Sequence, residues 1–179
     1  MLNNSLYSTA NPPWTMPAIA APAEHSSQSL GLPHVRLRLD DRTLAVLNTD
    51  LAQEVMVIPQ QRLTVMPNMP PAVMGLLNHR SRIFWALDLP QLFGLTPLDP
   101  RSPEYHLAIL RVNDKSVALA VQQVQGVARF TPDAIESPLD HEIAPGLVPY
   151  LQGCIPQTEA MLLVLDAAAI AAYDASPNW

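Results

Sequence analysis

The sequence predicts a mainly β protein built from barrels, with short helices at the connections between strands. Apolar and polar residues alternate in short runs; in the first run Val35, Leu37 and Leu39 alternate with Arg36 and Arg38, which is the period of a half-buried strand. Turns rich in Pro and Asp separate these runs, and the chain contains 19 prolines. Many short strands joined in this way are typical of a barrel-rich β fold.

The N-terminal segment, residues 1–33, is predicted to be a flexible tail rich in Pro, Ala and Ser. Its closely spaced prolines prevent a helix or a sheet ladder from propagating. Tyr7 and Trp14 form a candidate docking motif, because an aromatic side chain in a Pro-rich strip is a low-entropy anchor. For termini of this composition, however, a loosely attached or self-docked tail is the commoner arrangement.

The first half of the folded region is predicted to consist mostly of strands. Asp40 and Asp41 supply a turn between two strands, which makes a hairpin. Pro70 and Pro71 are placed to open a brief helix. The expected elements are strands at 35–39, 44–47, 55–58 and 63–66, a helix at 70–77, a strand at 83–87, and a helical turn at 89–93 closed by Gly94.

The second half repeats this pattern. Asn113 and Asp114 tolerate positive φ, so the runs on either side of them are expected to form another hairpin. Asp166 is placed to cap a C-terminal helix. The expected elements are strands at 106–112, 116–121 and 124–130, an irregular segment at 131–146, strands at 148–151 and 161–165, and a helix at 167–173.

Composition limits the classes of partner and compartment. The chain has 179 residues, 49% of them hydrophobic, which suits one large core or two small cores that share an interface. A net charge of −6, with ten Lys and Arg in all, argues against nucleic acid as a partner. The apolar runs are too short to span a bilayer, and no Lys or Arg precedes Arg36 in a leader-like segment. Together with the lone Cys154, these features predict a cytosolic protein without direct membrane insertion.

Residues 68–95 carry a recognisable motif. It contains a Pro, an apolar segment with Gly, an Asn-x-Arg turn, an apolar strand, and then Asp-Leu before a short helix that ends at Gly-Leu. The residues that make up this motif are Pro70, Gly75, Asn78, Arg80, Asp88, Leu89, Gly94 and Leu95. In this order and spacing they resemble the CheW-like adaptor family. The sequence departs from the family pattern at His79, Ser81 and Trp85, where an apolar residue, Gly and Pro are usual.

The resemblance implies a fold of two SH3-like, five-stranded antiparallel β-barrels with short connecting helices and a C-terminal helix. Barrel one would comprise about 34–88 plus 147–175, and barrel two about 89–146. It also implies a non-enzymatic adaptor that couples methyl-accepting receptors to a CheA-like histidine kinase, in a chemotaxis, phototaxis or type IV pilus array at the membrane. The partners would be the receptor's cytoplasmic tip and the kinase's regulatory domain. The alternative is a stand-alone competitor or insulator that binds one of these partners.

The same resemblance implies a docking site. In the family, the Glu of a Gln-Glu-Ile segment pairs with the Arg of the Asn-x-Arg turn, which here gives Glu54 with Arg80. A guanidinium and a carboxylate can fix one loop against another, although a surface ion pair without a partner role is also common. A receptor groove would be lined by Ala52, Val55, Val57, Gly75 and Leu76.

Three expectations about individual residues follow. Val55 is expected to be buried, and Gly75 to allow a close approach. In the strand at 83–87, Trp85 is expected in the core, and an exposed Phe84 would be a contact for the kinase.

Enzymatic readings find little support in the sequence. The five histidines show no metal-ligand spacing, and no nucleophile elbow or phosphate-binding Gly-rich loop occurs among only six glycines. An acidic cluster is interpreted as a solvated loop, with a small hydrolase as a remote alternative; its residues are Asp133, Glu136, Asp140, His141 and Glu142. No catalytic residue, metal or cofactor is therefore expected.

Overall fold

A computed structural model gives the fold, and it describes residues 31–138, 143–158 and 160–176. Residues 1–30 of the predicted N-terminal tail, which include Tyr7 and Trp14, lie outside the described residues. Asp140, His141 and Glu142 of the acidic cluster also lie outside them. At the end of that predicted tail, the first strand already begins at Leu32.

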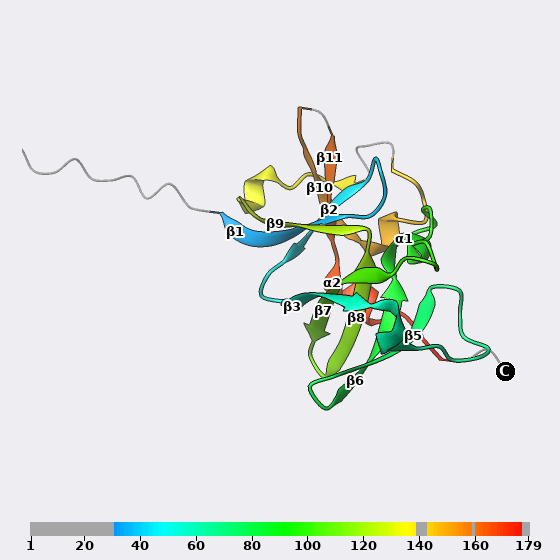
Figure 1. The fold of residues 1–179 in the computed structure, drawn as a ribbon. Coiled ribbons are helices and arrows are strands. Elements are labelled where there is room, and N and C mark those ends of the chain that lie inside the picture. Colours follow the sequence, from blue (N-terminus) through cyan, green and yellow to red (C-terminus); the bar gives the residue numbers. More distant parts are fainter. Residues whose placement is uncertain (1–30, 139–142, 159, 177–179) are drawn as a thin grey trace, which may run out of the picture.

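The described residues form two β-sheets, which lie one above the other in Figure 1. Sheet A has the strand order β10-β11-β2-β1-β9. Its strands are β1 (Leu32–Arg38), β2 (Leu44–Asn48), β9 (Gln123–Phe130), β10 (Leu151–Pro156) and β11 (Met161–Leu165). Sheet B has the order β3-β7-β8-β6-β5-β4. Its strands are β3 (Ala52–Pro59), β4 (Leu63–Thr64), β5 (Val73–His79), β6 (Arg82–Asp88), β7 (Glu104–Val112) and β8 (Lys115–Val121). The prediction of a mainly β fold is confirmed.

Short helices connect the strands, and one more follows the last strand. They are η1 (Gln60–Arg62), α1 (Leu89–Leu92), η2 (Pro132–Ala134), η4 (Val148–Tyr150) and α2 (Ala167–Ala171). Each α-helix begins at a predicted or motif Asp: Asp88 accepts a hydrogen bond from the N–H of Gln91, and Asp166 accepts from the N–H groups of Ala168 and Ala169. These caps satisfy N–H groups that have no partner within the first turn of a helix.

The predicted helix at 70–77 is wrong, because this segment contains strand β5. Its residues pair with β6 in an antiparallel register that runs from Val73↔Leu87 to His79↔Arg82. Gly75 has φ +141°, far from helical values, and marks a bulge in this pairing. The two prolines that suggested a helix start instead precede a strand, because β6 offers the apolar run a continuous hydrogen-bonding partner.

The strand pairing also divides the chain differently from the two predicted barrels. Strands β3, β5 and β6, expected in barrel one, form sheet B with β7 and β8. Strand β9, expected in barrel two, pairs with β1 in sheet A. Sheet B has six strands, and each sheet contains one parallel pair, β11 with β2 and β6 with β8. A parallel pair needs a crossover connection rather than a hairpin, so hairpins read from the sequence do not reveal these pairings.

Sheet B is strongly curled. Its two edge strands, β3 and β4, are separated in the chain by only the three residues of η1. Such a short connection requires the two edges of the sheet to lie near one another at that end, which is the arrangement of a small barrel.

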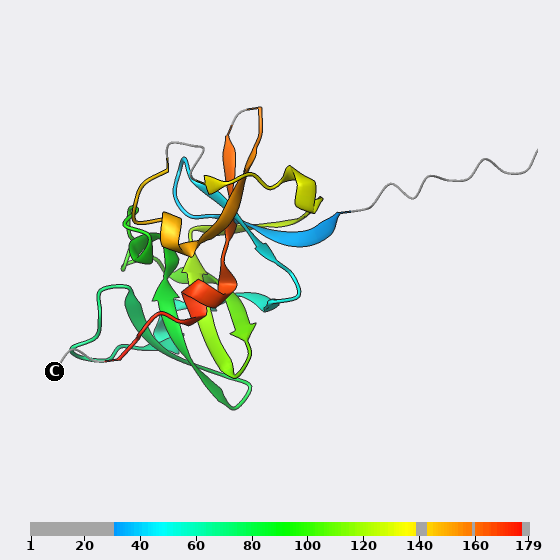
Figure 2. The same cartoon turned by 180° about the vertical axis from the view of Figure 1, so that it is seen from behind.

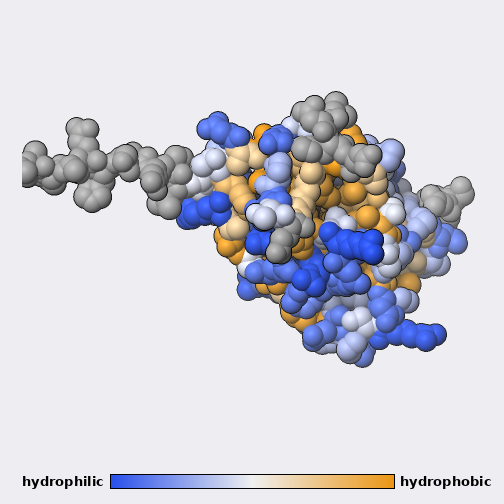
Figure 3. Space-filling model, turned by 90° about the horizontal axis from the view of Figure 1, so that it is seen from above, coloured by the Kyte–Doolittle hydropathy of each residue, from blue (hydrophilic) through white to orange (hydrophobic). Residues whose placement is uncertain are grey.

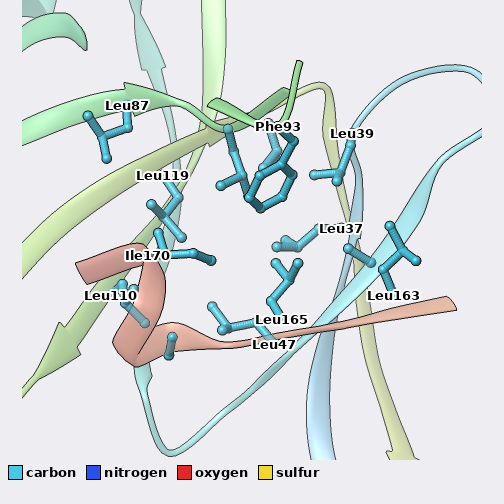
Figure 4. Close-up of a cluster of buried hydrophobic side chains, with 14 of the residues drawn as sticks. Leu37, Leu39, Leu47, Leu87, Phe93, Leu110, Leu119, Leu163, Leu165 and Ile170 are labelled. Atoms are coloured by element: carbon cyan, nitrogen blue, oxygen red, sulfur yellow. The ribbon is translucent and has the colours of Figure 1, made fainter. Parts of the chain in front are cut away.

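The main hydrophobic core lies between the two sheets. Leucines from both sheets converge there with Phe93 and with Ile170 of α2, as Figure 4 shows. Helix α2 packs between the sheets on the back of the molecule (Figure 2). A second cluster, which includes Leu77, Phe84 and Leu107, lies inside the curl of sheet B. Because one core is shared, we expect the two sheets to fold as parts of a single unit.

Candidate docking site

Strand β3 forms the edge of sheet B and carries exposed apolar side chains. Val55 and Val57 are 42% and 49% exposed, whereas Ile58 is buried and Met56 packs against the inner cluster of sheet B. This alternation follows from the period of two along a strand. The expectation that Val55 is buried is therefore wrong: the strand turns its other face, with Met56 and Ile58, to the core.

Other exposed large hydrophobic side chains are scattered over the molecule. In Figure 3, which views it from above, hydrophobic residues form patches separated by hydrophilic ones. The remaining exposed large hydrophobic residues are Leu32, Val65, Met66, Ile83 and Val127. Val55 and Val57 differ in standing together on the outer face of one edge strand, while Glu54 between Gln53 and Val55 turns to the opposite face and meets a charged cluster. This makes β3 the candidate docking edge.

The charged cluster is built by the hairpin of β5 and β6. Arg80 and Ser81 have φ of +49° and +61°, and the flanking residues His79 and Arg82 are paired. Two central residues with positive φ define a type I′ turn, whose twist suits a two-residue hairpin. The turn directs the side chains of His79 and Arg80 toward Glu54 of β3.

Glu54 contacts both of these side chains. Arg80 Nη2 lies 3.2 Å from Glu54 Oε1, and His79 Nε2 lies 3.2 Å from Glu54 Oε2. The predicted Glu54–Arg80 pair is confirmed as a contact. Arg80 is 75% exposed, so the pair contributes about 0–1 kcal/mol to stability, and its main effect is to hold the hairpin against β3.

Sequence reasoning missed the contact of His79 with Glu54. The signal for this contact was the position of His79 in the sequence. It directly precedes the turn residue Arg80, whose side chain was expected to pair with Glu54. A turn of only two residues keeps neighbouring side chains close to the same partner strand.

A hollow of about 330 Å³ lies beside this cluster. Its lining residues are Gln53, Glu54, His79, Arg80, Arg82, Phe84 and Ile109. Phe84 and Ile109 are buried at 6% and 3% exposure, so they form an apolar base, while Arg82 is exposed. The hollow thus combines an apolar base with a rim that carries two arginines and a histidine.

The remaining predicted groove residues do not line this hollow. Gly75 is buried, and a Cβ there would collide with the backbone carbonyl of Thr64 in β4. Its predicted close approach is confirmed, but the neighbour is another strand of the same sheet. Leu76, half-buried, pairs with Trp85 of β6, and Ala52 packs against the main core. Gly75 and Ala52 therefore belong to the packing of the fold, and none of the three residues lines the hollow.

Phe84 is not exposed, which corrects its assignment as a surface contact. It lies in the cluster inside sheet B, while Trp85 is partly buried against the main core between the sheets. Both faces of β6 are covered at this point, so neither aromatic has to face solvent. In the same strand it is Ile83 that is 69% exposed.

Two further findings bear on the type of site. Among the described residues, no group of three or more His, Cys, Asp or Glu side chains is placed to hold a metal ion. No helix in the part of the chain that the structure describes is long and apolar enough to cross a membrane.

Comparison with known proteins agrees with the fold. The family model described as CheW-like domain matches residues 33–174. The structure is similar to the crystal structure of scaffolding protein TtCheW from Thermoanaerobacter tengcongensis, with a TM-score of 0.66 and 20% sequence identity. The similarity covers 76% of this chain and 89% of that chain. The comparison with curated proteins gave no match.

Proposed function

Since the chain belongs to the CheW-like domain family, we propose that it is a non-enzymatic adaptor that couples methyl-accepting receptors to a CheA-type histidine kinase. The observation that carries this proposal is the contact of Glu54 with Arg80 on β3, the edge strand that also exposes Val55 and Val57. The resemblance of the motif to the family had led us to expect this pair. The protein would act in the cytoplasm, at receptor arrays that serve chemotaxis, phototaxis or type IV pilus motility.

The receptor's cytoplasmic tip is the partner that this surface suits. An amphipathic helix gains affinity by laying its apolar face on apolar side chains, and Val55 and Val57 offer such a surface in an accessible position. Burial contributes roughly 25 cal/mol per Å² of apolar surface removed from water. Glu54 and Arg80 would hold the β5–β6 hairpin at the edge of this surface. The binding surface would then already be formed before the receptor arrives.

The kinase would bind elsewhere, through its own regulatory domain. An adaptor has to hold both partners at once, so the two contacts must use different edges of the fold. The exposed side chain of Ile83 lies on β6, which pairs with β5 and β8 and not with β3, and it is the exposed large apolar side chain of that strand.

A competitor or insulator that binds one partner is the second candidate. The specific observation in its favour is the hairpin tip, where His79 shares the carboxylate of Glu54 with Arg80 and Ser81 occupies a positive-φ position. These two residues replace the apolar residue and the Gly of the motif, at the edge of the proposed receptor surface.

A binding experiment separates these possibilities. The full-length chain is mixed with a soluble fragment of a receptor's cytoplasmic tip and, separately, with the regulatory domain of a CheA-type kinase from the same genome. Binding to both supports the adaptor, and binding to one supports the competitor. Failure to bind either would overturn both proposals. Val57→Asp should abolish receptor binding only, because it places a charge on the proposed apolar contact.

A further inference from the structure

The hollow next to Glu54 carries more positive charge than its own acid can neutralise. Both carboxylate oxygens of Glu54 are engaged, one by Arg80 and the other by His79. Among the described residues, no carboxylate lies within ion-pair distance of Arg82, which lines the same hollow. One arginine of the rim is therefore left without an acidic partner.

Arg62 adds to this local excess of positive charge. Its Nη2 donates a hydrogen bond of 2.9 Å to the carbonyl oxygen of Asn78, close to the hairpin tip. The whole chain has a net charge of −6. A cluster of arginine side chains at one end of sheet B is therefore opposite in sign to the net charge of the protein. Complementary charge at an interface steers association and selects the partner.

The shape of the hollow suits an acidic side chain. Phe84 and Ile109 form an apolar base that can contact the methylene groups of a Glu or Asp. Its volume of about 330 Å³ is roughly ten times the 30 Å³ or so that a water molecule occupies in the liquid. Arg80 and Arg82 are exposed in the free protein; once a docked partner excludes bulk water, a guanidinium holds a carboxylate more strongly, and it can do so with two parallel hydrogen bonds.

We propose that the hollow receives a carboxylate side chain from the docking partner, and that Arg82, with Arg80 beside it, binds that carboxylate. This inference rests on the proposed function in taking the receptor tip as the partner. The docking helix would then lie across the edge formed by β3, presenting apolar residues to Val55 and Val57 on its outer face and a Glu or Asp to Arg82 in the hollow on the other. Arg82 would select which receptor tips bind.

The test measures the Kd of the full-length chain for a soluble receptor-tip fragment. Arg82→Gln removes the charge and leaves a shorter polar side chain; it should weaken binding by at least about thirtyfold, since an unpaired buried carboxylate is left in the complex. It should also make the Kd less sensitive to salt. Arg101→Gln is the matched control, because Arg101 is an exposed arginine that does not line the hollow. Its effect should stay within about twofold, as expected for a charge outside the contact.

A charge exchange identifies the partner residue. Arg82→Glu should abolish binding, and changing one Glu or Asp of the receptor fragment to Arg should restore it. The thermal unfolding midpoint of each variant shows that it is folded; since Arg82 has no acidic partner among the described residues, these midpoints should stay near that of the unaltered protein.

The outcomes distinguish this inference from the proposed function. If Arg82→Gln binds normally while Val57→Asp does not, the receptor surface is correct and the carboxylate site is wrong. Equal weakening by Arg82→Gln and Arg101→Gln would show a general charge effect and would also overturn the site. If the unaltered chain fails to bind the fragment, the proposed receptor contact itself fails, and the carboxylate site fails with it.

Discussion

At the scale of single residues, the hairpin tip combines the contact of Arg80 with Glu54 and an unfavourable backbone conformation. Arg80 and Ser81 both have positive φ, which costs an L-residue other than Gly roughly 1–2 kcal/mol. From this position the Arg80 side chain contacts Glu54. The Ser81 side chain makes no described contact with Glu54, so a substitution that relieves the backbone strain at Ser81 removes no contact of this cluster.

Ser81→Gly should therefore stabilise the protein. The gain should be about 0.5–1 kcal/mol, because relief of the left-handed strain is partly offset by the greater backbone entropy of Gly in the unfolded chain. Urea unfolding measures it as a higher midpoint with an unchanged slope. Asn113→Gly is the control: Asn113 has φ +53° in the β7–β8 turn, but Asn tolerates this region, so its gain should be smaller. A loss of stability in the Ser81 variant would contradict this account of the turn.

Gly75 provides a second prediction at this scale. Gly75→Ala should cost more than about 2 kcal/mol, because its φ is +141° and the added Cβ would collide with the Thr64 carbonyl of the neighbouring strand. Gly94→Ala has a positive φ of +74° but open space around the Cβ, so it should cost only about 1–2 kcal/mol. Thermal or urea unfolding compares the two. Equal losses of unfolding free energy would show that β4 can move away from the added Cβ at no cost. Close approach of β4 would then not be the reason for a Gly at position 75.

At the scale of elements, the features set by local chemistry were predictable. The Asn113-Asp114 turn, the Asp40 turn and the cap at Asp166 each depend on residues a few positions apart, and all three occur. The helix predicted at 70–77 failed because its outcome depends on a distant partner. Pro70 and Pro71 favour a helix start locally, but β6 supplies hydrogen bonds along the whole apolar run. Tertiary pairing of this kind overrides a weak local preference.

Helix α1 gives a prediction about pH. The Asp88 side chain is buried, and it accepts hydrogen bonds from the N–H groups of Gln91 and Leu98. Burial raises the pKa of Asp88, and the two hydrogen bonds only partly counter this. The folded protein therefore binds this proton more tightly than the unfolded chain does. The stabilisation that follows is fully present below the ordinary carboxyl pKa and is lost as pH rises through the raised folded pKa.

Asp88→Asn tests this. The variant should be less stable by about 1–3 kcal/mol near neutral pH, because an amide has one acceptor oxygen for two N–H groups. The difference in unfolding free energy between the unaltered protein and the variant should be largest at acidic pH and should shrink as pH rises through the folded pKa. Urea unfolding across a pH series measures it. A difference that grows with pH would mean that the hydrogen bonds outweigh burial at this carboxylate.

At the scale of the whole molecule, the sequence was informative about class and family but not about which strands pair. Barrel boundaries were placed by chain order, whereas β9 returns to β1 across more than eighty residues and β3 joins β7. The Glu54–Arg80 contact was reached through the family resemblance, because no local pattern links residues so far apart. Alternation along β6 put Phe84 and Trp85 on opposite faces, but it could not show that both faces are covered. Burial depends on what packs against a strand, and that is a property of the complete fold.

The shared core leads to a prediction for the whole molecule. Leu37 of sheet A and Leu119 of sheet B are both fully buried in the cluster between the sheets. Either Leu→Ala change should cost about 2–5 kcal/mol, the usual range for a buried leucine. Because each sheet lacks a separate cover for this face, either change should destabilise both sheets together in one transition. Hydrogen exchange measures this: under conditions of global unfolding, Leu37→Ala should speed amide exchange in β8 as much as in β2. Protection that stays unchanged in β8 while β2 exchanges faster would show that the sheets open separately, and the mutual support of the two sheets would have to be abandoned.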